Sequence, residues 1–268
     1  MRLVKVDSVR NKIYAEDCFK TMQRLKDKEV SLILTSPPYN TSKHTYTEKS
    51  RHNHDSRYDI YIDTGSHKDY VDWSIKLFRE FDRILQSNGC VLYNINYGTG
   101  YENTCDNLID IVHNIITNTP FMVADIIGWK KSNALPNNTS SNKCTRIFEL
   151  VFVLCRKSEN KTFISNKEVK SVSKTGQNFY VNMFNFIEAP NNDGSCKLNK
   201  ATFSSDFALK LLEMYAGQKT GIVYDPFIGT GTTALAVKLF NRKYDRKYFY
   251  VGSELSEEQV KFAMNRLR

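Results

Sequence analysis

The sequence has 268 residues, of which 41% are hydrophobic and 25% charged, as in globular proteins with one large α/β domain and room for a small lobe. It contains no apolar run of about 18 residues and no apolar N-terminal segment, which argues against a transmembrane span and a signal peptide. The formal net charge of +9 favours a polyanionic partner.

The cysteine and histidine patterns argue against disulfides and metal sites. The six cysteines are scattered with no C-x-x-C pair, which is typical of reduced thiols in a cytoplasmic protein. His52 and His54 are close in sequence, but no Cys, Asp or Glu constellation accompanies them. We therefore expect no metal and a cytoplasmic location.

The first elements form a strand–helix–strand unit. Residues 11–27 read as a short strand, an acidic turn and a helix, because apolar residues recur at three-residue spacing from Phe19 to Leu25. Asp17 precedes this helix and is expected to cap it. An apolar strand follows at 30–35, and the unit opens a parallel sheet.

A polar and aromatic cluster ends this second strand: Thr35-Ser36-Pro37-Pro38-Tyr39-Asn40. Prolines cannot donate to a sheet ladder, so the strand stops at Ser36, at the carboxyl edge where open α/β sheets bind ligands. The Ser36 hydroxyl and a nearby carbonyl can accept hydrogen bonds from an amino group, and Tyr39 can stack on a flat heterocycle. The alternative is a strand followed by a simple Pro-Pro turn.

Residues 41–68 read as a long, mobile, basic loop beside this cluster, either a functional lid or a disordered segment. Its basic side chains suit contacts with phosphates. Alternating elements follow it, and the helix that comes first is terminated by Asn88-Gly89. These elements are a helix at 69–87, a strand at 90–95, a helix at 104–117 and a strand at 121–129.

Residues 130–200 are rich in Lys and Asn, and basic residues outnumber acidic ones from Lys130 to Lys174. The segment 132–143 reads as loop, and 148–155 as an apolar strand. Basic residues interleaved with aromatic ones suit nucleic acid. A small lobe with a core of its own is the alternative.

The last part of the chain contains a glycine-bearing turn between a strand and a helix, Asp225-Pro226-Phe227-Ile228-Gly229-Thr230-Gly231-Thr232-Thr233. Before it, a helix capped by Ser205 or Asp206 ends at Gly217. Glycines in such a turn let the backbone approach a ligand, and Glu254, which ends the next strand, could accept ribose hydroxyls. The third glycine of NAD folds and the Gly-Lys-Thr of ATP P-loops are missing, so another adenosine ligand is expected.

The stretch from Asp225 to Thr233 resembles the S-adenosylmethionine motif of amino-directed DNA methyltransferases, and Thr35-Ser36-Pro37-Pro38-Tyr39 resembles their catalytic (D/N/S)-P-P-(Y/F) motif. The catalytic motif comes first, which is the permuted order of the β class. One departure lies at 199–205, where the segment before the cofactor motif has neither the His nor the Pro that the family often carries there.

The resemblance implies an α/β fold, a Rossmann-like methyltransferase fold with an open, mostly parallel twisted sheet flanked by helices. Residues 1–129 would form the catalytic half, 130–200 a small basic target-recognition region with a core strand near 148–155, and 201–268 the cofactor half. The implied cofactor is S-adenosylmethionine, and the implied substrate is double-stranded DNA in a bacterium, phage or virus. A homodimer and a cognate restriction endonuclease stay open as partners.

The resemblance also implies roles for single residues. Ser36 and the Pro37 carbonyl would accept hydrogen bonds from the target amine, Pro38 completes the motif, and Tyr39 would stack on the flipped base. Asp17 would contact the adenine side of the cofactor and Glu254 the ribose. The remaining cofactor residues would be Thr35, Asp225, Phe227, Gly229, Gly231, Thr232 and Thr233.

Ser-Pro-Pro-Tyr resembles the N4-cytosine group of the family, whereas Asp-Pro-Pro-Tyr is usual for N6-adenine, so cytosine is favoured over adenine. An RNA methyltransferase is a further alternative. Protein glutamine methyltransferases of this type carry Asn-Pro-Pro-Tyr after the cofactor motif, so the motif order argues against them. A DNA-binding protein with a degenerate cofactor pocket is the alternative outside enzymes.

Overall fold

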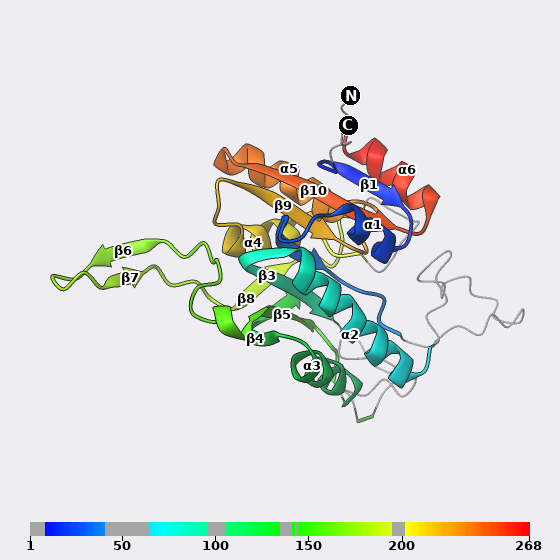
Figure 1. Cartoon of the computed structure of the whole chain (residues 1–268), viewed down its shortest axis with the longest axis horizontal. Helices are drawn as coiled ribbons and strands as arrows, with labels where there is room; N and C mark the ends of the chain where they lie inside the picture. The colour runs from blue at the N-terminus through cyan, green and yellow to red at the C-terminus, as the bar shows by residue number, and fades with distance from the viewer. Residues whose placement is uncertain (1–8, 41–64, 96–105, 135–140, 143, 195–201) are drawn as a thin grey trace, which may run out of the picture.

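An eight-stranded sheet forms the centre of the fold, in the order β1-β10-β9-β2-β3-β5-β4-β8 (Figure 1). All neighbouring strands are parallel except the two pairs that β5 makes with β3 and β4. The expectation of an open, mostly parallel α/β sheet is therefore confirmed. The strands are β1 (Lys12–Ala15), β2 (Val30–Thr35), β3 (Leu85–Ile95), β4 (Phe121–Lys131), β5 (Phe148–Arg156), β8 (Phe186–Ala189), β9 (Thr220–Asp225) and β10 (Lys247–Glu254).

The computed structural model describes residues 9–40, 65–95, 106–134, 141–142, 144–194 and 202–268. Most of the expected loop at 41–68 lies outside these residues. Its last part does not: Ser66 caps a helix that begins at His67, and the His67 Nε2 atom lies 2.8 Å from a carboxylate oxygen of Asp110. The end of the expected loop is thus helical.

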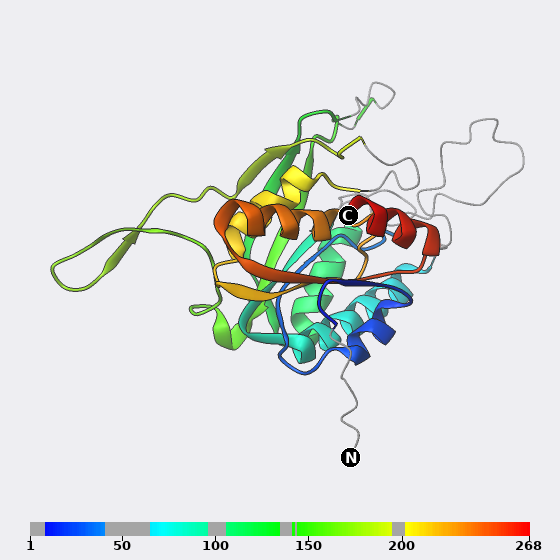
Figure 2. The same ribbon diagram turned by 90° about the horizontal axis from the view of Figure 1, so that it is seen from above.

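Helices cover both faces of the sheet (Figure 2). Side chains of a strand alternate between faces, so Ile33 packs with the buried residues of α1, α2 and α3, whereas Leu32 and Leu34 pack with those of α4 and α5. The final helix, α6, has no counterpart among the elements expected from the sequence. The helices are α1 (Cys18–Arg24), α2 (His67–Ile84), α3 (Asp106–Asn118), α4 (Ser205–Tyr215), α5 (Thr232–Tyr244), α6 (Glu257–Arg266) and the short 3-10 helix η1 (Lys157–Glu159).

Some element ends are where the sequence places them and others differ. Asp17 caps α1 as expected, since its side chain accepts a hydrogen bond of 2.9 Å from Phe19 N. The cap of α4 is Ser204, one residue before the expected position. The helix expected to continue to residue 87 ends at Ile84, because the chain turns into an extended conformation there and Leu85 opens β3.

The region 130–200 has no separate core among its described residues. Its strand β5 and the unexpected four-residue strand β8 belong to the main sheet. The remaining pair, β6 (Val169–Val172) and β7 (Asn178–Tyr180), forms a hairpin that buries none of its residues and projects from the body of the molecule (Figure 1). The chain leaves β5 for this hairpin at Arg156, which is paired with Phe121, the first residue of β4. The hairpin therefore starts from the amino edge of the sheet.

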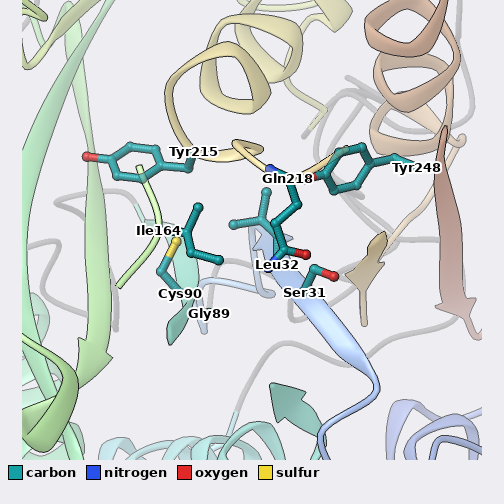
Figure 3. Close-up of a pocket in the computed structure, with 8 residues that line it drawn as sticks. All are labelled: Ser31, Leu32, Gly89, Cys90, Ile164, Tyr215, Gln218 and Tyr248. Carbon is teal, nitrogen blue, oxygen red and sulfur yellow. Dashed lines mark hydrogen bonds between the residues drawn. The ribbon is translucent and has the colours of Figure 1, made fainter. Parts of the chain in front are cut away.

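A small cavity lies near the same edge, between β2, the first half of β3 and the end of α4 (Figure 3). Its volume of about 10 Å³ leaves room for a single water molecule at most. It is therefore not a cofactor site. The lining residues are Ser31, Leu32, Gly89, Cys90, Ile164, Tyr215, Gln218 and Tyr248.

None of the described helices combines the length and the apolar composition that crossing a bilayer would require.

Candidate active site

The two sequence motifs meet at the carboxyl ends of β2 and β9, which are neighbours in the sheet. From β2 the chain continues to β3 on one side, and from β9 to β10 on the other. This is a topological switch point, where open α/β sheets bind ligands. Here the Thr35 hydroxyl donates a hydrogen bond of 2.9 Å to an Asp225 carboxylate oxygen.

Asp225 organises the turn that follows β9. Its fully buried carboxylate accepts hydrogen bonds from Phe227 N (3.0 Å) and from the Thr233 hydroxyl (2.5 Å) in addition to Thr35. Burial raises the pKa of Asp225 to about 6, although the three hydrogen bonds act in the opposite direction. The carboxylate thus links the end of β2, the turn and the first residues of α5.

The glycines of this turn have backbone conformations that favour glycine. Gly229 has φ of 51° and Gly231, which precedes α5, has φ of 83°. A Cβ atom at Gly231 would also lie 2.9 Å from the Cβ of Ala263 in α6. Gly231 therefore serves the backbone and the packing of α6, and the approach of a ligand to the turn stays a prediction.

The two acidic residues expected at the cofactor lie where two adjacent strands, β10 and β1, end at the same edge of the sheet. Glu254 is the last residue of β10 and pairs with Ala15, and Asp17 follows β1 two residues later. Asp17 is exposed and its carboxylate caps α1. One carboxylate oxygen of Glu254 accepts a hydrogen bond from Ser256 N (2.9 Å).

The threonines expected at the methionine end are both buried and both hydrogen-bonded within the protein. Thr233 donates to Asp225, and the Thr232 hydroxyl accepts from Arg266 Nη1 at 3.2 Å. Arg266 also forms an ion pair with Asp193. No sequence pattern indicates Arg266 or Asp193, because the two residues are 73 apart and lie in segments of weak periodicity.

An aromatic series connects the glycine turn with the proline motif. The half-buried ring of Phe227 lies 5.6 Å from that of Trp73, which lies 5.4 Å from Tyr70. The Tyr70 hydroxyl donates a hydrogen bond of 2.6 Å to the Pro38 carbonyl. The helical spacing of Tyr70 and Trp73 indicates core positions only, so their contacts with both motifs are a finding of the structure.

Within the proline motif, Pro37 and Pro38 are buried and Ser36 is half-buried. The Ser36 hydroxyl lies 2.6 Å from the Tyr39 hydroxyl. The Tyr39 ring is only 7% exposed and packs in the core. The stacking of a base on Tyr39 therefore stays a prediction, which requires this ring to become accessible.

Two polar side chains, Asn94 and Glu149, lie near the Tyr39 hydroxyl, and the sequence patterns do not indicate this contact. The Tyr39 hydroxyl is 3.5 Å from the Asn94 Oδ1 atom of β3 and 3.5 Å from Glu149 Oε2 of β5. The buried Glu149 forms an ion pair with Lys131, the last residue of β4. The only signal in the sequence is a charged residue, Glu149, near the start of an apolar strand. Because β5 runs antiparallel, its first residues lie at the edge where the other strands end.

Among the described residues, no three His, Cys, Asp or Glu side chains form a group that could hold a metal ion.

Comparison with known proteins supplies independent findings. A family model described as DNA methylase, N6_N4_Mtase, matches residues 30–265. The type II methyltransferase M.HinfI of Haemophilus influenzae is 24% identical over 274 residues, which cover 98% of this chain and 70% of the relative.

Two solved structures share the fold. The PvuII DNA methyltransferase, described as cytosine-N4-specific, has a TM-score of 0.69 at 15% identity and covers 97% of this chain and 86% of its own. The complex of M1.HpyAVI with S-adenosylmethionine has a TM-score of 0.58 at 21% identity, and the match covers 96% of this chain and 99% of the M1.HpyAVI chain.

Proposed function

The chain belongs to the N6/N4 DNA methylase family, and from this premise we propose that it methylates N4 of cytosine at a specific sequence in double-stranded DNA. As a member of the family it is an S-adenosylmethionine-dependent DNA methyltransferase that acts on the amino group of adenine or cytosine. The choice of cytosine, the recognition of a specific sequence and the roles of single residues are proposals.

The observation that carries the proposal is the hydrogen bond between Thr35 and Asp225. It joins the two motifs that methyl transfer to an amine requires, one to hold the amine and one to hold the methyl donor. The joined motifs lie at the switch point, with Ser36 directly after Thr35. The Ser36 hydroxyl can therefore meet an amine beside the turn that follows Asp225.

The residues at this edge fit S-adenosylmethionine by their chemistry. Glu254 and Asp17 offer carboxylates to the ribose hydroxyls and the adenine amine, and the half-buried ring of Phe227 offers an apolar contact. The 13-residue helix α5 directs its N-terminus at the turn, which suits the carboxylate of the methionine part. We propose these contacts, with Thr35, Asp225, Gly229, Gly231, Thr232 and Thr233 shaping the turn.

When bound, S-adenosylmethionine supplies an electrophilic methyl group. The exocyclic amine of a base is a poor nucleophile, because its lone pair is delocalised into the ring. Ser36 and the Pro37 carbonyl would accept hydrogen bonds from the amine and localise the lone pair toward the methyl group. The target base must leave the duplex to reach this edge, and Tyr39 would stack on it.

The DNA is proposed to lie across the carboxyl edge of the sheet. The connection from β4 to β5 leaves this edge at Lys131 and returns to it at Phe148. Within the target-recognition region proposed for 130–200, this connection is therefore better placed to read bases than the hairpin β6–β7, which leaves from the amino edge. We expect a cytoplasmic enzyme, and a second copy or a cognate endonuclease as partner is a further proposal.

The deciding experiment is mass spectrometry of nucleosides from duplex DNA treated with the protein and S-adenosylmethionine. We expect N4-methylcytosine. N6-methyladenine in its place would overturn the choice of cytosine and favour the N6-adenine alternative. Methyl transfer to structured RNA but not to duplex DNA would overturn the substrate, and binding of DNA without transfer to any base would overturn the activity.

A further inference from the structure

The hydrogen-bond partners behind Tyr39 determine which way its hydroxyl points. A carboxylate accepts hydrogen bonds and donates none, so Glu149 Oε2 can only receive the proton of Tyr39. The amide of Asn94 is oriented in the same sense, because its Nδ2 donates to the Leu150 carbonyl at 3.2 Å and its Oδ1 therefore faces Tyr39. Both neighbours thus present acceptors to the tyrosine hydroxyl.

This arrangement has a consequence for Ser36. A phenol has one proton, and with that proton directed at Glu149 and Asn94 the Tyr39 oxygen is left to accept. Either hydroxyl could donate across the 2.6 Å between Ser36 and Tyr39, and the acceptors 3.5 Å from Tyr39 assign Ser36 as the donor. Its own proton being engaged, Ser36 presents only lone pairs to a substrate. That is the state in which it accepts from an amine.

We infer that Glu149 is a positioning residue, which acts through Tyr39 to keep the Ser36 hydroxyl an acceptor for the target amine. The inference rests on the proposed function and adds to it the direction of the hydrogen bond between Ser36 and Tyr39. Were the series reversed, Ser36 would direct a proton at the amine, and two donors would face each other.

Lys131 completes the arrangement from β4. Glu149 is 5% exposed, and burying a carboxylate costs free energy unless it has a partner. The ion pair with Lys131 supplies the partner, and it engages Oε1, leaving Oε2 toward Tyr39. The ion pair between Lys243 and Glu213, which joins α5 to α4 outside the proposed target-recognition region, has the same residue types but is more exposed, and so it serves as a matched control.

The test is steady-state methylation of duplex DNA by the full chain, with cofactor binding measured separately by calorimetry. Glu149→Gln keeps the shape of the side chain but can direct an amide donor at Tyr39. We expect kcat to fall roughly 10- to 100-fold, as for the loss of one hydrogen bond to a buried group, while the Kd for S-adenosylmethionine is unchanged. Glu213→Gln should leave both quantities unchanged.

Two further variants distinguish a reversed hydrogen bond at Tyr39 from a structural effect of leaving Lys131 without its ionic partner. Asn94→Asp in the Glu149→Gln background restores a carboxylate beside Tyr39, and we expect it to recover most of kcat. Lys131→Met in the same background removes the unpaired charge but restores no acceptor, so kcat should stay low. An unchanged kcat in Glu149→Gln, or recovery with Lys131→Met and not with Asn94→Asp, would overturn the inference. Wild-type protein that transfers no methyl group would instead overturn the proposed function.

Discussion

Thr35 and Asp225 are 190 residues apart in sequence, and their side chains form a buried hydrogen bond of 2.9 Å. Asp225 has two further donors, one from the turn and one from α5. The end of β2 is thereby connected to the turn that we propose for the cofactor. The residues that we propose for the amine and those that we propose for the methyl donor are thus aligned by one carboxylate.

Thr35→Val tests this connection, since valine keeps the shape and removes the donor. We expect the free energy of unfolding to fall by about 1–3 kcal/mol, the cost of losing a hydrogen bond to a buried charged group. Urea denaturation measures the change. Thr35→Ser keeps the hydroxyl, so its free energy of unfolding should fall less. Equal falls in the two variants would show that the threonine methyl group, and not the hydrogen bond, matters.

The raised pKa of Asp225 predicts a pH dependence of stability. The pKa of the Asp225 carboxyl is about 6 in the folded protein, whereas its ordinary value is 3.8. Protonation of Asp225 therefore favours the folded state. The contribution is fully present below about pH 4 and is lost as the pH rises through 6. Urea denaturation between about pH 4 and pH 7 should show a smaller fall in stability over this range for Asp225→Asn than for the wild type. Parallel curves would contradict the assignment.

Gly231→Ala should destabilise the protein by about 1–3 kcal/mol, because alanine is strained at positive φ and its Cβ would meet Ala263. Gly176 provides a matched control, since it has the same φ of 83° in the hairpin turn, and no atom of the described residues lies within 4 Å of where a Cβ would be. Gly176→Ala should show the backbone cost alone. Thermal unfolding compares the two, and equal losses would argue against the contact with α6.

Much of the fold follows from local patterns. Apolar periodicity and turn residues locate the strands β2, β9 and β10 and the helices α1 and α5, because each of these elements buries apolar side chains. The short strand β1 is also located, although it is only half-buried. Strand β8 is not predicted because it has four residues, of which only Ile187 and Ala189 face the core. Helix α6 is not predicted because only two of its ten residues, Gln259 and Ala263, are buried, so it has no strong apolar stripe.

Part of the candidate site could also be predicted from the sequence, and part could not. The two motifs are visible as continuous stretches, and the sheet order then brings Ser36, Asp225 and Glu254 to one edge. The approach of Glu149 to Tyr39 could not be predicted, because it depends on the antiparallel direction of β5 and on its register with β4. Such pairings are set by long-range packing, which leaves no local pattern in the sequence.

The role proposed for Ser36 is tested by Ser36→Ala. Alanine removes the acceptor for the target amine but leaves the turn after Asp225 intact, so we expect kcat to fall by roughly 100-fold or more while the Kd for S-adenosylmethionine is unchanged. Single-turnover methylation of duplex DNA and calorimetry measure the two quantities.

Ser87→Ala is the control, because Ser87 is exposed near the amino end of β3 and outside the proposed target-recognition region. It should leave both the rate and the Kd unchanged. If Ser36→Ala weakened cofactor binding as much as turnover, Ser36 would belong to the cofactor site. If it changed neither, the hydroxyl would have no part in catalysis. A selective loss of kcat is expected for Ser36→Ala, because the contacts that we propose for the methyl donor lie in the turn after Asp225, which this substitution leaves intact.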